Sequence, residues 1–168
     1  MRYCTVLLHA VDRALFWICG LLVLAFAVLL VLQVVLRFAF GVPLFWLEEF
    51  CVFLLVGLTF LGAAMAWGRR AHVTVDMLPT MLPDSRRAIL FVLVDVIVLF
   101  FALWAAKAGW EFAFFSMNKR ALTMNMPVGY GYLAVPVAFA VVAVQSAIFL
   151  LLRLKGAAEP FATPQMEI

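Results

Sequence analysis

The sequence predicts an all-α membrane protein with four transmembrane helices and with both termini in the cytoplasm. Two totals support the membrane assignment: 68% of the 168 residues are hydrophobic and only 12% are charged, whereas soluble domains are about 45–50% apolar and about 25% charged. The third observation is the position of the charges, most of which lie at the ends of four long apolar segments. Together these observations indicate a chain that folds in lipid.

Four segments have about the 20 residues that a helix needs to cross the hydrocarbon of a bilayer. They cover residues 14–36, 45–67, 88–115 and 132–154. We expect no membrane-spanning strands, because an isolated strand cannot satisfy its backbone hydrogen bonds in lipid. The first segment exceeds the 7–15 apolar residues of a secretory signal, so we expect it to remain in the protein as a span.

Residues 41–43, 79–83 and 126–129, which contain proline and in the first and last case also glycine, interrupt the chain between these segments. None of the connections is long enough to hold a soluble domain. We therefore expect residues 1–155 to form a single transmembrane domain. Residues 156–168 are small and polar and contain proline, and we expect them to be a disordered tail.

The distribution of lysine and arginine predicts the orientation. Eight of these residues lie before the first span, in the second connection or after the last span, and three lie in the first and third connections. Cytoplasmic loops carry the excess of positive charge. Both termini are therefore expected on the cytoplasmic side.

Asp95 is the most deeply placed ionisable residue, about two turns into the third span. At 100° per residue it shares one helix face with Ala102, Ala106, Gly109 and Ala113. Small residues let a second helix approach closely, so Asp95 should face protein rather than lipid. It either bonds across a helix interface or is protonated, or else it is a carboxylate that couples ions or protons. We favour a structural role, because no other polar groups converge at that depth.

A second polar group is expected at the outer ends of three helices. It consists of Arg37 at the end of span one, Glu48 and Glu49 at the start of span two, and Lys107 and Glu111 late in span three. These charges could pair with one another in the interfacial layer. Adjacent residues diverge by about 100° on a helix, so one of the two glutamates can face the bundle while the other faces a partner or water.

The sequence contains no set of residues that would indicate an enzyme or a cofactor-binding protein. The cysteines show neither metal-ligand nor disulfide spacing, and no set of residues forms a catalytic constellation. His9 and His72 are the only histidines and are both expected near the cytoplasmic surface. A transmembrane cytochrome would need histidines inside the bundle as axial ligands. We therefore expect no enzyme activity, no metal and no cofactor.

Two ordered sets of residues carry a family resemblance. The first is Arg37-Phe38-x-Phe40, Pro43, Trp46-x-Glu48-Glu49, Phe60-Leu61-Gly62-Ala63-Ala64 and Arg70-Ala71-His72-Val73-x-Val75-Asp76; the second is Met126-Pro127-x-Gly129-Tyr130 with Tyr132-Leu133-Ala134-Val135-Pro136-Val137. Over roughly residues 13–155 the chain resembles the small membrane subunit (DctQ-like) of tripartite ATP-independent periplasmic (TRAP) transporters. It departs from the family in one respect: the stretch 53–58 lacks the tryptophan that usually stands in the middle of the second helix.

The resemblance implies a scaffold subunit in the bacterial inner membrane. Such systems combine a periplasmic substrate-binding protein with two membrane subunits and take up organic acid anions. The large subunit holds the substrate and sodium sites and moves as an elevator, while the small subunit supports it and helps to dock the binding protein. No nucleic acid partner is implied. The residues that we expect at partner interfaces or in structural contacts are Arg37, Trp46, Glu48, Glu49, His72, Asp76, Asp95, Lys107 and Glu111.

Two other hypotheses remain open. The chain could be a self-sufficient four-span exporter coupled to protons through Asp95, although such carriers place the key carboxylate in the first span, where Gln33 is the polar residue here. It could also anchor a redox enzyme in the membrane. The absence of histidines from the spans disfavours that function.

Overall fold

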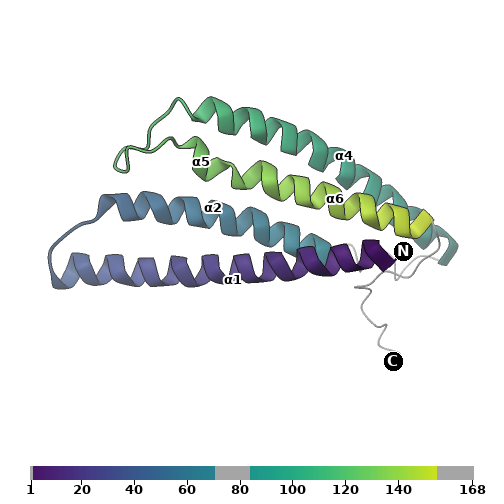
Figure 1. Ribbon diagram of the computed structural model, residues 1–168, viewed down its shortest axis with the longest axis horizontal. Helices are drawn as coiled ribbons and strands as arrows, with labels where there is room; N and C mark the ends of the chain where they lie inside the picture. The colour runs from purple at the N-terminus through teal and green to yellow at the C-terminus, as the bar shows by residue number, and fades with distance from the viewer. Residues whose placement is uncertain (1, 71–83, 155–168) are drawn as a thin grey trace.

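The computed structural model describes residues 2–70 and 84–154, and this part of the chain is helical apart from the connections (Figure 1). The helices are α1 (Arg2–Ala39), α2 (Phe45–Gly68), α4 (Asp84–Ser116), α5 (Gly129–Tyr132) and α6 (Ala134–Leu154). Within these residues the only β-type pairing is an isolated bridge between Arg120 and Pro127. The predicted all-α fold is therefore confirmed.

Four helical segments are long and apolar enough to cross a membrane, with mean hydropathies between 2.2 and 3.0. They match the four spans expected from the sequence, with two differences at their boundaries. The helix that contains the first span begins at Arg2, well ahead of residue 14. The last span begins at Gly129, because it includes the one-turn helix α5, which Leu133 separates from α6. The expected disordered tail, residues 156–168, lies outside the described residues.

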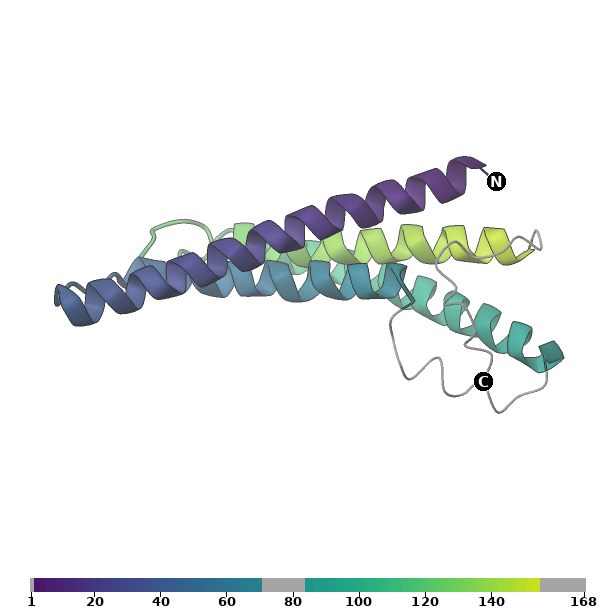
Figure 2. The ribbon, with the colours of Figure 1, turned by 90° about the horizontal axis from the view of Figure 1, so that it is seen from below.

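The helices pack as a row in the order α1, α2, α6, α4 (Figure 1). Helix α2 contacts α1 on one side and α6 on the other, and α4 packs against α6. The short helix α5 contacts α4, α2 and α6 near one end of the row. In the second view α1 crosses obliquely over α2 (Figure 2). Since α1 and α4 form the two edges, each of them leaves a broad face uncovered by this chain.

Small residues determine how closely α4 approaches α6. Ala102 and Ala113 are fully buried, as is Asp95 on the same face. A side chain added at Gly109 would contact Val135 and Pro136 of α6 at 3.4 Å, so the two backbones are nearly in contact. The face predicted from the sequence is thus the face that packs against α6.

The helices of the row lie lengthwise beside one another, and the two sides of the row where the helices begin and finish differ in their chemistry; we call these sides the two ends of the row. The terminal end is where α1 and α4 begin and where α2 and α6 finish. The hairpin end holds the connections 40–44 and 117–128. At the terminal end α1 also reaches α6, because Leu8 packs against Phe149 and Leu152. The polar contacts of the described residues gather mainly near these two ends.

Candidate functional site: polar contacts at the two ends of the row

A buried carboxylate joins three helices at the terminal end. Asp95 of α4 is completely buried. Arg70, which follows α2, places Nη2 2.7 Å from Oδ1 and 3.0 Å from Oδ2 of this carboxylate. Arg153, in the last turn of α6, places Nε 3.2 Å from Oδ2. One negative and two positive side chains therefore form a buried cluster, which we call the Asp95 cluster, and it links α2, α4 and α6.

Aromatic rings complete the surroundings of both arginines. The Arg70 guanidinium lies 4.0 Å from the ring centroid of Phe149 and 5.1 Å from that of Trp67. The Arg153 guanidinium lies 4.4 Å from the ring centroid of Phe91. The negative face of an aromatic ring attracts a cation. These rings compensate part of the hydration that the arginines lose on burial.

Next to the Asp95 cluster, about halfway along α6, lie two neighbouring polar residues. Gln145 and Ser146 are both buried, and Trp67 Nε1 donates a hydrogen bond to Ser146 Oγ at 2.9 Å. Gly68 lies directly against Gln145, since a Cβ atom at Gly68 would come within 2.5 Å of the amide nitrogen Nε2. A glycine at this position lets α2 end against the polar side chains of α6.

The backbone at the end of α2 aims Arg70 at Asp95. The last turn closes with hydrogen bonds from the Arg69 N–H to the Met65 carbonyl and from the Arg70 N–H to the Trp67 carbonyl. Arg70 then adopts a left-handed conformation, with φ of 55°, which is uncommon for a residue with a Cβ atom. Such a conformation persists where surrounding contacts hold it, and the ion pair with Asp95 provides that contact.

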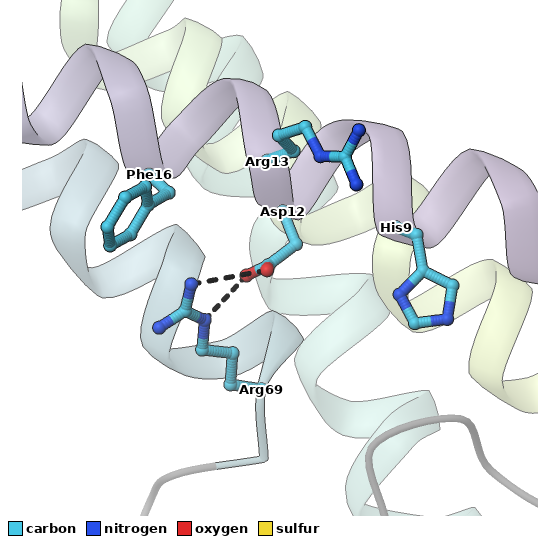
Figure 3. Close-up of a pocket in the computed structure, with 5 residues that line it drawn as sticks. All are labelled: His9, Asp12, Arg13, Phe16 and Arg69. Carbon is cyan, nitrogen blue, oxygen red and sulfur yellow. Dashed lines mark hydrogen bonds and ion pairs between the residues drawn. The ribbon is translucent and has the colours of Figure 1, made fainter.

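A second ion pair joins α1 to the end of α2. Arg69 donates to Asp12 from Nε at 2.6 Å and from Nη2 at 3.2 Å, and this hydrogen bonding raises the pKa of the Arg69 guanidinium above its ordinary value. The pair forms part of a surface pocket of about 300 Å³ (Figure 3). His9, Arg13 and Phe16 line the rest of it, and His9 and Arg13 extend away from the ion pair (Figure 3). The pocket is open, and its charges do not converge on one point.

At the hairpin end, Glu48 contacts the end of α1. Gln33 Nε2 donates to Glu48 Oε1 at 2.7 Å, and Arg37 Nη1 lies 3.8 Å from the same oxygen. The side chains of Arg37 and Glu48 are about half exposed. Glu48 therefore connects the two helices on either side of the first connection.

Glu49 points in another direction and binds the connection 117–128. Its carboxylate accepts hydrogen bonds from the backbone N–H groups of Leu122, Thr123 and Met124 at 2.8, 3.0 and 3.3 Å, and from the Thr123 hydroxyl at 2.5 Å. Consecutive N–H groups directed at one anion form a favourable nest. The two adjacent glutamates thus diverge, one toward α1 and the other toward the connection 117–128, so Glu49 contacts this chain, whereas we expected from the sequence that one of the two would face a partner or water.

The remaining candidate residues are not brought into this group. Lys107 and Glu111 contact each other at 3.9 Å on the outside of α4, and both are well exposed. Helix α4 lies at the opposite edge of the row from α1 (Figure 1), so the expected single outer cluster is divided into separate contacts. Trp46 is partly exposed near the start of α2. His72 and Asp76 lie outside the described residues.

The sequence-based reasoning missed several partners of these charges. The sequence predicted no ion-pair partner for Arg70 or Arg153, and Asp12 was not among the candidate residues. A usable signal was present, because four antiparallel spans place the ends of α2 and α6 on the same side of the membrane as Asp95. Within the described residues, no group of three or more histidine, cysteine or acidic side chains could hold a metal ion.

Comparisons with known proteins place the sequence in a transporter family. The sequence model of the DctQ component of tripartite ATP-independent periplasmic transporters matches residues 26–156. The chain is 30% identical over 128 residues to a protein of Haemophilus influenzae strain Rd named as a TRAP transporter small permease protein, covering 76% of this chain and 80% of that protein. It is also 32% identical over 82 residues to the sialic acid TRAP transporter permease protein SiaT of Haemophilus influenzae strain 86-028NP, covering 49% of this chain and 13% of that protein. The match extends over most of the chain, which therefore belongs to the DctQ family of TRAP transporter small permeases and is a transporter component, not an enzyme.

Proposed function

We propose that this chain is the immobile scaffold subunit of a sodium-coupled TRAP transporter in the bacterial inner membrane. In this proposal it supports a large permease subunit that moves as an elevator and carries the sodium and substrate sites. It also helps to dock a periplasmic binding protein that delivers organic acid anions. Both termini of the chain lie in the cytoplasm.

The packing of the helices in a row is the observation that carries the proposal. Because α1 contacts α2, α2 contacts α6 and α6 contacts α4, the described helices form an open row and not a ring around a central channel. A transport pathway needs polar groups around a cavity in the membrane. Here the polar side chains between helices are tied to one another, as in the Asp95 cluster and in the contacts of Glu48 and Glu49. The arrangement suits a static brace rather than a conduit.

The hairpin end has features that suit docking of a soluble protein. The connection 117–128 is ordered by the bonds to Glu49 and by paired backbone bonds, from the Ala121 N–H to the Met126 carbonyl and from the Val128 N–H to the Lys119 carbonyl. At its tip Leu122 is 97% exposed. This loop therefore offers an apolar side chain, in a fixed position, to a docking partner. With cytoplasmic termini, this end faces the periplasm.

The alternative of a self-sufficient proton-coupled exporter is disfavoured by the surroundings of Asp95. A carboxylate that carries protons has to gain and lose them during each cycle. The Asp95 carboxylate is instead buried between two guanidinium groups at 2.7 and 3.2 Å, an arrangement that favours a permanent ion pair.

Reconstitution into liposomes tests the proposed function. The purified chain alone should take up no organic anion, while vesicles that also contain the large permease subunit should show sodium-dependent uptake when the binding protein is added. Leu122→Asp should reduce that uptake without reducing recovery of the two membrane subunits together. Lys119→Asp, in the same connection, is the matched control variant. Uptake by the small chain alone would overturn the proposal.

A further inference from the structure

Helix α4 presents a mixed apolar and charged face to the outside of the row. Phe100, Trp104, Lys107 and Glu111 follow one another at spacings of four, three and four residues, so they lie within an arc of about 60°. Phe100 is 75% exposed and Trp104 is 63% exposed; the side chains of Lys107 and Glu111 are 79% and 68% exposed. The opposite face of the helix packs against α6 through its small residues. We call these four outward residues the α4 outer face.

The two charges of this face lie inside the apolar part of the helix. The candidate span runs from Ile89 to Ser116, and Lys107 precedes its end by nine residues, or about 13 Å of helix. Exposed phenylalanines occupy the turn between Glu111 and the helix end: Phe112, Phe114 and Phe115. Exposed aromatic side chains therefore flank the Lys107–Glu111 pair on both sides along the helix. We therefore expect the pair to lie within the hydrocarbon layer rather than above it.

Lipid tails are a poor environment for such a pair. The ammonium and carboxylate are 3.9 Å apart, so their contact leaves most of their hydrogen-bonding capacity unused, and acyl chains offer neither donors nor acceptors. Charged side chains within membrane spans usually face protein or water. The outward face of α1 shows the contrast, because Leu21, Leu24 and Val31 are exposed there without a charge among them. Lipid tails can therefore cover the outward face of α1, whereas the α4 outer face is better covered by another protein chain.

A second copy of this chain is a poor occupant. Copies of one membrane protein share the same orientation, so a symmetric pair is related by an axis along the membrane normal. Such an axis brings equal heights together, and packing two α4 outer faces would set Lys107 against Lys107 and Glu111 against Glu111. Like charges in a low-dielectric layer repel strongly. The occupant should be a different chain.

We propose that the α4 outer face is the docking surface for a membrane-spanning helix of the large permease subunit, with polar groups of that helix level with Lys107 and Glu111. The inference rests on the proposed function and adds that the large subunit lies at the α4 edge of the row. Phe100 and Trp104 supply the apolar contact area. Trp104 also brings an indole N–H, for which an interface can provide an acceptor.

Site-specific photocrosslinking tests the proposal in the assembled complex. A benzophenone amino acid is introduced at Trp104, or at Leu24 on α1 as a control of equal exposure, 64%. The labelled chain is co-expressed with the large subunit, irradiated in membranes, and purified through a tag on the large subunit. We expect an adduct of the small and large subunits from position 104, at least about fivefold stronger than that from position 24.

A charge exchange tests the polar part of the face. The double variant Lys107→Glu with Glu111→Lys keeps the i, i+4 pair and places the glutamate on the N-terminal side, the better orientation within a helix, so the isolated chain should fold as before. We expect recovery of the large subunit with it to fall at least about fivefold. Recovery equal to that of the unchanged chain would overturn the role of the charges.

The crosslinking outcomes separate the inference from the proposed function. An adduct from position 24 but not from position 104, an adduct with a second small subunit, or no adduct at either position while the two subunits copurify would each overturn the assignment of α4 and leave the scaffold function standing. Failure of the two subunits to copurify at all would overturn both.

Discussion

Replacing Asp95 by asparagine keeps the size of the side chain but removes the negative charge between two arginines. Asp95 is fully buried, and the side chains of Arg70 and Arg153 are only 12% and 15% exposed. The asparagine oxygen can still accept a hydrogen bond. It cannot compensate the two positive charges, which would then lie close together in a region that water barely reaches.

The expected loss follows from the burial of all three groups. Removing one partner of a buried ion pair costs about 3–5 kcal/mol, because the remaining charge is left uncompensated. Two guanidinium groups depend on this carboxylate, so we expect a value within that range for the free energy of unfolding. A loss of about 3 kcal/mol lowers the folding equilibrium constant more than a hundredfold.

The assay is denaturant unfolding of the purified chain in detergent micelles, followed by tryptophan fluorescence. Glu48→Gln is the matched control, because its pair with Arg37 is about half exposed and exposed pairs contribute about 0.2–1 kcal/mol. The triple variant Arg70→Met, Asp95→Leu, Arg153→Met should recover most of the stability, since a buried ionic cluster can be replaced by apolar residues at little cost. If Asp95→Asn unfolds no more easily than Glu48→Gln, our account of this cluster is wrong.

Three further predictions concern individual contacts. Gly129→Ala should lower the free energy of unfolding by about 1–3 kcal/mol, because the added Cβ would meet the Ala113 carbonyl oxygen. The control is Gly62→Ala, whose Cβ meets nothing within 4 Å, and which should be neutral or stabilising by about 0.5–1 kcal/mol. Equal effects of the two variants in the unfolding assay would refute the contact at Gly129. Glu49→Gln should speed amide hydrogen exchange at residues 122–124 about tenfold or more, since it removes hydrogen bonds to a charged group; unchanged exchange rates would show that the carboxylate does not hold this connection. Because hydrogen bonding to Asp12 raises the pKa of Arg69, the stability from this pair is complete below the ordinary arginine value and is lost only as the pH rises through the raised one. The unfolding free energies of Asp12→Asn and the unchanged chain should therefore differ by the same amount at pH 7 and pH 9, and a difference that shrinks at pH 9 would contradict this.

The number and boundaries of the spans were predictable because hydrophobicity acts along the chain. Four apolar stretches have to become helices in lipid, and their lengths fixed the positions of α2 and α4 to within a few residues. The extension of α1 back to Arg2 was not predictable in the same way. Its first four turns contain His9, Asp12 and Arg13, which interrupt the apolar pattern but not the helix.

The packing partners of the charges depend on information that periodicity does not contain. The face of Asp95 was correct because small residues recur on it, yet the partners Arg70 and Arg153 come from segments 25 and 58 residues away in the chain. Their meeting requires the order of helices in the row, which follows from side-chain packing in three dimensions. For the same reason Lys107 and Glu111 were expected beside Arg37 and Glu48, although α6 lies between α4 and α2 and α1 occupies the opposite edge.

The length of α1 has a consequence for what lies beyond the bilayer. Its 38 residues measure about 57 Å, while the hydrocarbon is about 30 Å thick and helices tilt by at most about 40°. A tilt of 40° accommodates only about 39 Å of helix within that layer. Several turns must therefore stand clear of the acyl chains, and the charges near Asp12 place them on the N-terminal side. The first turns of α1 therefore project as a rigid helix beyond the bilayer, and a soluble protein that approaches this side contacts them before it reaches the lipid.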